Sequence, residues 1–318
     1  MSDYCIPDIR WNIVYQIKSC QAYEDRFVVK GNFHSLVPDD IIKEFEIAER
    51  LMAYSYYCYP MYDEALKKLL GMTEMAVKLR CTQFDISLEF QDRNGKVKQR
   101  TLSELMDQLL IIEPNKPLKS EFSKARKARN IFAHPDHHSI YGVMIFDSIL
   151  QLINTINYIF LEDQICKESN AYFDELCQSY RSFGNGDLIL EYNGMRYLAY
   201  GSKCLEVHPI SGEWISLWVF YPEITNIREQ VETQNYSMPL YLALKDVKIE
   251  DNCLIGTDIE SNKAIKFLST NEPKDLERIA TFRKQLNECE QTSKTFYLDW
   301  LNSEMGKKLV HHRYKYYW

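Results

Sequence analysis

IFDSILQLINTINYIF (residues 145–160) carries the strongest helical periodicity in the chain and decides how its first half folds. Five aliphatic residues recur there at intervals of three or four positions: Ile145, Ile149, Leu152, Ile156 and Ile159. This spacing places them on one face of a helix that starts near residue 140. Polar residues interrupt the apolar stretch from Val143 to Leu161, as in an amphipathic helix. We therefore expect a central packing helix and no membrane span.

Two helices and a small β element are expected before residue 101. The first helix starts at Asp39, a residue type that caps helices, and runs to about Tyr57. The second follows Pro60, which breaks the first. Residues 84–100 alternate between apolar and polar, and Asn94-Gly95 supplies a turn that tolerates positive φ. This stretch predicts a small β insertion between helices.

Two further helices lead up to the central one. Residues 101–104, Thr-Leu-Ser-Glu, have the form of a capping box, so a helix should start there and end before Pro114. The next helix runs from Ser120 to His134. It should stop at that point because Pro135 disfavours the α conformation in the residue before it.

The residue patterns at the two ends of the chain differ from those of this helical part. β-branched and aromatic residues in 1–37 predict an N-terminal β segment, which could pack on the C-terminal module. Residues 38–180 form the expected helical domain. Turn residues follow at 182–186, and strand-like runs then predict a β-rich α+β module over 181–318, with a regulatory or sensing role. The expected fold class is α+β.

Composition excludes several classes of protein. The formal charge of −7 opposes a protein that coats nucleic acid through bulk positive charge, so any contact with a polyanion must be local. Nine cysteines without a Cys-x-x-Cys pair fit neither a disulfide framework nor a zinc ribbon. The N-terminus lacks the features of a secretory signal. We expect a cytoplasmic protein with no cofactor and no metal.

KARKARNIFAHP (residues 124–135) is the stretch that points to chemistry. It resembles the HEPN endoribonuclease family, whose members carry Arg, then a polar residue, then His near the end of a helix. Arg129, Asn130 and His134 match this pattern with four residues between Arg and His. The resemblance covers roughly residues 39–166 and implies that this part is an all-helical bundle. It also implies that these three residues are catalytic.

Helix geometry can be examined without the family. At 100° per residue, Arg129, Asn130 and His134 fall on one broad face, and Phe122, Ala125, Ala128, Ile131 and Phe132 fall on the opposite side. Since Arg129 and His134 lie at the two edges of the polar face, one copy supplies a sparse site. Two copies paired about a twofold axis would present two arginines and two histidines to one phosphate. We therefore expect an isologous homodimer.

The implied reaction is RNA cleavage without a metal ion, by attack of a 2′-hydroxyl on the neighbouring phosphodiester. Histidine suits both proton transfers, because its pKa of about 6.5 lets one imidazole accept a proton while another donates one. Arg129 would hold the phosphate. Lys124, Arg126 and Lys127 are candidate RNA-binding residues. With Lys116 and Lys119 they form a positive patch that only Glu121 opposes.

Less specific interpretations remain open beside this one. His134 could cap the helix end while Arg129 pairs with a carboxylate. Residues 134–138, His-Pro-Asp-His-His, could bind a metal. The tail at 311–318 mixes cations with aromatics and could stack RNA bases or dock on its own protein.

Relatives of this type include toxins and abortive-infection effectors against phage. The resemblance thus implies an antiphage defence role and a partner such as an antitoxin or another defence-system protein. The alternative function is a non-catalytic HEPN scaffold that binds RNA, a nucleotide or a protein.

Overall fold

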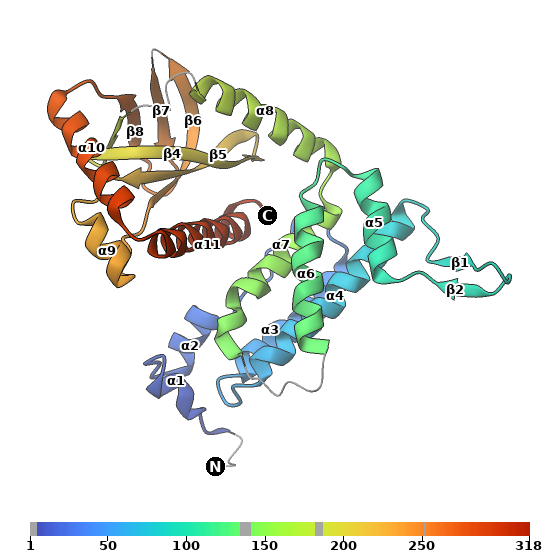
Figure 1. Cartoon of the computed structure of the whole chain (residues 1–318). Helices are drawn as coiled ribbons and strands as arrows, with labels where there is room; N and C mark the ends of the chain where they lie inside the picture. The colour runs from blue at the N-terminus through green and yellow to red at the C-terminus, as the bar shows by residue number, and fades with distance from the viewer. Residues whose placement is uncertain (1–4, 134–140, 182–186, 251) are drawn as a thin grey trace. The chain divides into compact units, whose positions relative to one another are not determined.

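The computed structural model describes residues 5–133, 141–181, 187–250 and 252–318. By its internal contacts the chain divides into two compact units, whose elements are labelled in Figure 1. The first, the helical unit, comprises residues 1–164 with 313–316 and 318. The second, the barrel unit, comprises residues 165–312 and 317. The expected division of the chain into domains at residues 37 and 180 rests on changes in the pattern of apolar and polar residues, and it stays a prediction.

Helices dominate the helical unit, and one two-stranded hairpin interrupts them. In chain order its elements are α1 (Ile9–Ile13), α2 (Cys20–Phe27), α3 (Asp39–Tyr54), α4 (Met61–Gln83), β1 (Glu89–Gln91), β2 (Val97–Gln99), α5 (Leu102–Ile112), α6 (Leu118–Ala133), the 3-10 helix η2 (Gly142–Ile145) and α7 (Phe146–Phe160). The β insertion expected at residues 84–100 is confirmed as the antiparallel hairpin β1–β2.

α7 forms the core of this unit, because every residue from Ile149 to Phe160 is buried. The prediction of a central packing helix is confirmed. Its buried polar residues find partners: Asn157 Nδ2 donates to the carbonyl of Asn32 at 2.9 Å, and its Oδ1 accepts from the backbone N–H of His34 at 3.0 Å. By length and composition alone Gly142–Phe160 could cross a membrane, but 72% of its apolar window is buried inside the protein.

Residues 313–316 and 318 also belong to the helical unit. Trp318 Nε1 donates to Asn154 Oδ1 of α7 at 2.7 Å, and the Tyr314 hydroxyl donates to the carbonyl of Lys30 at 2.7 Å. Of the two alternatives for the C-terminal tail, docking on its own protein is therefore the one observed.

The prediction of an N-terminal β segment is wrong, because the described residues of that segment fold into the helices α1 and α2. Local caps start both helices: Asp8 accepts a hydrogen bond from the N–H of Arg10, and Ser19 accepts one from the N–H of Ala22. The aromatic residues that suggested strands instead build a cluster, in which Trp11 is 1% exposed and its Nε1 donates to the carbonyl of Ser55 at 2.9 Å. Tertiary burial and capping outweigh β propensity here.

A closed six-stranded antiparallel barrel forms the centre of the barrel unit (Figure 1). The elements of this part of the chain are α8 (Asp163–Arg181), β3 (Leu188–Tyr192), β4 (Met195–Ile210), β5 (Glu213–Pro222), α9 (Ile227–Thr233), β6 (Leu240–Glu250), β7 (Cys253–Asp258), β8 (Ala264–Ser269), α10 (Pro273–Glu288) and α11 (Gln291–Tyr316). Each strand pairs with the next, and β3 pairs with β8 to close the barrel, with Leu190 opposite Phe267.

Side chains fill the barrel, as is usual for a small one. Leu190, Trp218, Phe220 and Phe267 are fully buried inside it, and the end of α8 adds Tyr180 to the same core. The barrel is thus a packed scaffold, and the buried hydroxyl of Ser216 accepts a hydrogen bond from Trp218 Nε1 at 2.9 Å.

The expected fold class, an all-helical HEPN bundle with an N-terminal β segment and a β-rich α+β module, is wrong. The chain is mixed α/β with a closed barrel in its C-terminal part. Strand-like runs of apolar residues indicated the strands, of which β5 buries six consecutive residues, 215–220. Closure depends on pairing between β3 and β8, which lie more than 60 residues apart in the sequence, and no local pattern reports it.

Candidate functional site

α6 is held in place by its apolar side. Leu118 and Phe122 are fully buried, and Ala125 is 6% exposed, whereas Arg129 and Asn130 near the C-terminal end of the helix are exposed. The helix therefore buries its apolar side and exposes Arg129 and Asn130, as expected. This holds for its side chains up to residue 130, the last one described. The side chains of residues 131–133, which include two predicted apolar positions, lie outside that range.

Within the part of the chain that the structure describes, Arg129 forms one ion pair. Its Nη2 lies 3.8 Å from Glu74 Oε2 on α4, and its side chain keeps 55% of its surface exposed. Glu74 also accepts a hydrogen bond from Lys78 at 2.8 Å. An exposed ion pair at this distance contributes about 0–1 kcal/mol, so a phosphate could replace the carboxylate. The alternative interpretation had two parts, a helix-capping His134 and an Arg129 paired with a carboxylate. The second part is observed.

His134 lies outside the described residues, as does the candidate metal sequence at 134–138. The structure describes the chain on both sides of them. The far side is anchored: Asp63 Oδ2 accepts from the N–H of Tyr141 at 3.1 Å, and its Oδ1 accepts from the N–H of Gly142 at 2.8 Å. Burial raises the pKa of Asp63, and these two N–H groups oppose the shift. α6 and this anchor are thus the described structure on the two sides of residues 134–140.

The predicted RNA-binding cations lie at different depths along α6. Lys124 and Lys127 are exposed, and Lys124 Nζ lies 3.2 Å from Gln151 Oε1. Arg126 is half-buried, and its Nη1 donates to the Ser103 hydroxyl in the first turn of α5 at 2.8 Å. Two of the three side chains are thus available to a ligand, and the third joins α6 to α5.

The positive patch is smaller than expected, because Lys116 is not on the surface. Its side chain is fully buried, and its Nζ forms an ion pair with Glu113 at 2.6 Å and donates to the carbonyl of Ile159 at 3.1 Å. Glu121 is also buried, and Arg313 Nη1 lies 3.3 Å from its Oε1. Since a buried lysine requires a paired carboxylate, Lys116 serves the packing of the unit. Lys119, Lys124 and Lys127 remain as exposed patch residues.

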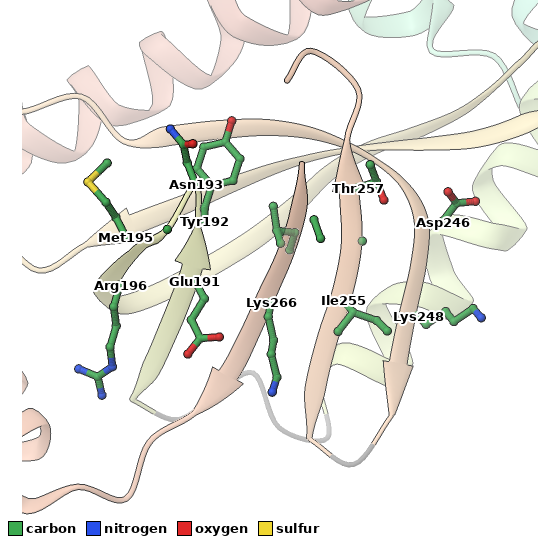
Figure 2. A pocket seen from close by; sticks show the side chains of 14 residues that line it. Glu191, Tyr192, Asn193, Met195, Arg196, Asp246, Lys248, Ile255, Thr257 and Lys266 are labelled. Atoms are coloured by element: carbon green, nitrogen blue, oxygen red, sulfur yellow. The ribbon is translucent and has the colours of Figure 1, made fainter. Parts of the chain in front are cut away.

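Sequence reasoning missed a groove of about 770 Å³ on the outer face of the barrel. Figure 2 shows side chains from neighbouring strands along it, and the register places one row in direct cross-strand contact: Glu191, Lys266, Ile255 and Lys248. Outward positions of alternating strands are the signal that could have found this row. Glu191 lies next to Lys266, and Ile255 separates Lys266 from Lys248. The row therefore mixes both signs of charge with an aliphatic residue and does not indicate one class of ligand.

A pair of thiols in the barrel unit was also missed. Cys177 on α8 and Cys204 on β4 are hydrogen-bonded to each other, which lowers the pKa of Cys177 to about 7 and raises that of Cys204 well above its usual range. Both are free thiols. Among the residues that the structure describes, no group of three or more His, Cys, Asp or Glu side chains could hold a metal ion.

The chain matches no protein-family model, and no curated protein is significantly similar to it in sequence.

Proposed function

We propose that this chain is an endoribonuclease that cleaves RNA without a metal ion, at a site shared by two copies of the chain. The residues that would carry the reaction are Arg129, Asn130 and His134. The motif that these residues form, with its resemblance to HEPN ribonucleases, is the basis for the proposal.

The observation that supports the proposal best is the surface at the end of α6. Arg129 and Asn130 are exposed side by side, one turn before His134, and Lys124 and Lys127 are exposed on the same helix. The chain as a whole carries a formal charge of −7, so a local group of exposed cations is not a consequence of composition, although Lys124 lies 3.4 Å from Glu121 and Arg129 lies 3.8 Å from Glu74. Such a group attracts a polyanion locally.

The proposed reaction divides the proton transfers between two imidazoles. His134 of one copy removes the proton from the 2′-hydroxyl, whose oxygen attacks the adjacent phosphorus. The bond from phosphorus to the 5′-oxygen breaks, and the imidazolium of the second copy supplies the proton to that oxygen. The products are a 2′,3′-cyclic phosphate and a 5′-hydroxyl, and no water is consumed.

Arg129 would act on the phosphate itself. Its planar guanidinium can donate two hydrogen bonds to two phosphate oxygens, and this interaction strengthens as negative charge accumulates in the transition state. Because its bond to Glu74 is long and exposed, little is lost when the side chain turns to the substrate. Asn130 would orient the imidazole or bind the RNA strand.

Cleavage of end-labelled RNA in EDTA tests the proposal. We expect His134→Ala and Arg129→Ala each to lower the rate by a factor of about 10² or more, as for the loss of a general acid or base or of a charge-stabilising donor. Arg50→Ala, which removes an exposed arginine of α3, is the matched control and should retain full activity. A substrate with a 2′-deoxy nucleotide at the cleavage position should resist the enzyme. Equal activity in all three variants would show that the motif is not the active site.

The ion pair of Arg129 with Glu74 favours the second candidate, a scaffold that binds RNA or a protein without cleaving it. The same assay separates the two: RNA binding without cleavage in the native protein indicates the scaffold. We also propose that the ribonuclease serves antiphage defence as a toxin or abortive-infection effector. Expression of the native chain should then arrest growth of a bacterial host, and expression of His134→Ala should not.

A further inference from the structure

The hairpin β1–β2 projects from the helical unit between the end of α4 and the start of α5 (Figure 1). Its turn is well built. Asp92 Oδ1 accepts from the N–H groups of Asn94 at 2.9 Å and Lys96 at 3.0 Å, and Gly95, with φ of +78°, takes the position that favours glycine. The tip therefore presents its side chains from a fixed backbone.

This hairpin adds nothing to the hydrophobic core. No residue between 86 and 101 is buried, and Val97, the largest aliphatic residue of β2, is 60% exposed. An isolated two-stranded hairpin is at best marginally stable in water. An element that buries so little contributes little to folding, which suggests that it serves contact with another molecule.

The charges of the hairpin match a polyanion. Residues 86–100 contain four cations, Arg93, Lys96, Lys98 and Arg100, against two carboxylates, Glu89 and Asp92. Both carboxylates are engaged: Asp92 pairs with Lys98 at 2.8 Å, and Glu89 accepts from Gln99 at 2.5 Å. The exposed tip residues Arg93 and Lys96 have no ion-pair partner within the described ranges.

The base of the hairpin leads toward the motif helix. Arg100 directly precedes Thr101, the N-cap of α5, and Ser103 in the first turn of α5 accepts the hydrogen bond from Arg126 at 2.8 Å. Arg126 lies one turn before Arg129 and Asn130 on α6. The four residue steps of extended strand from Lys96 to Arg100 span about 13 Å. The base of the hairpin is thus connected to the motif helix through α5, because the hydrogen bond from Arg126 to Ser103 joins the two helices.

We propose that the β1–β2 hairpin is an RNA-binding arm, whose cations hold the phosphodiester backbone of the substrate while the strand continues to α6. This inference rests on the proposed ribonuclease function and names the surface that binds its substrate. Two-stranded ribbons are a known means of binding nucleic acid. Contacts to phosphates position a strand without reading its sequence, so the arm should bind RNAs of different sequence equally.

Charge reversal at the tip tests the arm. The full-length protein is titrated with fluorescent single-stranded RNA that carries 2′-O-methyl groups throughout and cannot be cleaved, at several salt concentrations. We expect Arg93→Glu/Lys96→Glu to weaken binding at least about 10-fold and to flatten the dependence of log K on log salt by about 1.4, since each phosphate contact to a single strand contributes about 0.7. Lys43→Glu/Arg50→Glu, which reverses one lysine and one arginine exposed on α3, is the charge-matched control.

Two results would overturn the arm. In the first, the tip variant keeps the native affinity and salt dependence, as it would if the hairpin bound an acidic protein instead of RNA. In the second, the control loses as much affinity as the tip variant. The readout is independent of cleavage, so failure of the nuclease proposal is seen separately, as unchanged cleavage in Arg129→Ala and His134→Ala. Circular dichroism and thermal unfolding of the tip variant should match those of the native protein, because both substituted side chains are exposed.

Discussion

One carboxylate, Asp275, ties α10 to the barrel. Arg196 on β4 donates from Nη2 to Asp275 Oδ2 at 2.6 Å, and the Thr270 hydroxyl donates to the same oxygen at 2.8 Å. The hydrogen bond from Arg196 lowers the pKa of Asp275, although burial opposes the shift. A carboxyl group whose pKa is lower in the folded state than in the unfolded state stabilises the fold above the unfolded pKa of about 3.9. That contribution is lost as the pH falls through the folded-state pKa below it.

Asp275→Asn should therefore destabilise the barrel unit in a pH-dependent way. At pH 7 we expect a loss of about 1–3 kcal/mol in the free energy of unfolding, because the ionised acceptor of a charge-assisted hydrogen bond is gone. The difference from the native protein should shrink as the pH falls below about 4. Urea unfolding of the full chain between pH 7 and pH 3 measures it, with the exposed Glu277→Gln on the same helix as control. An equal loss at both pH values would contradict the assigned ionisation.

Single residues also show which features could be predicted from the sequence and which could not. The exposure of Arg129 and Asn130 follows from helical spacing, because Phe122 and Ala125 must face the core. The burial of Lys116 does not follow from spacing. It depends on Glu113, which also pairs with Arg80 of α4 at 2.5 Å, and that contact joins segments 33 residues apart. A lysine in a basic stretch therefore counts toward a surface patch only after its tertiary partners are known.

The geometry of η2 depends on its first residue, a glycine. Gly142 has φ of +53°, and a Cβ at this position would overlap the ring of Tyr59. That ring has little freedom to move, because the Tyr59 hydroxyl is hydrogen-bonded to that of Tyr15 at 3.0 Å and the ring packs 4.9 Å from Trp11. Gly142 is the second described residue after the sequence segment that carries His134.

Gly142→Ala should destabilise the helical unit by about 2–3 kcal/mol or more, through strain at positive φ and overlap with Tyr59. Gly71→Ala is the matched substitution. It lies inside α4 with nothing within 4 Å of an added Cβ, so it should stabilise the unit by about 0.5–1 kcal/mol. Urea unfolding of both variants checks the pair. Similar small effects in both would mean that Gly142 is not constrained as described.

The elements that could be predicted are those whose signals are local. The capping box at α5 is present in both directions, with Thr101 Oγ1 accepting from the N–H of Glu104 and Glu104 Oε2 accepting from the N–H of Thr101. The Asn94-Gly95 turn gives a hairpin as expected. The N-terminal segment was mispredicted because Trp11 is buried among Tyr23, Phe27 and Tyr59 and donates to the carbonyl of Ser55, in the connection between α3 and α4. Sequence alternation cannot distinguish this burial from burial in a sheet.

For the whole molecule, an uneven charge distribution matters more than net charge. The chain is acidic, yet its hairpin tip and the exposed side of α6 carry exposed cations, of which Lys124 and Arg129 have a carboxylate within 4 Å. Binding through such a local patch should weaken steeply with salt, because each phosphate contact releases counterions. A net charge of −7 would at the same time limit nonspecific coating of nucleic acid. This combination suits an enzyme that must engage one strand and release it.

A site shared by two copies makes a quantitative prediction at this scale. Native protein is mixed with the inactive double variant Arg129→Ala/His134→Ala, and the subunits are allowed to exchange while the total concentration is held constant. If both copies must supply their residues, only native homodimers cleave RNA, so an equal mixture should retain about one quarter of the native activity, whereas independent subunits would retain about one half. Light scattering should give the mass of a dimer for the native protein and for the mixture. The double variant keeps the exposed hairpin, so substrate must be in excess to avoid competition for RNA. Activity that falls in direct proportion to the native fraction would exclude the shared site and leave a nuclease that works as a single chain.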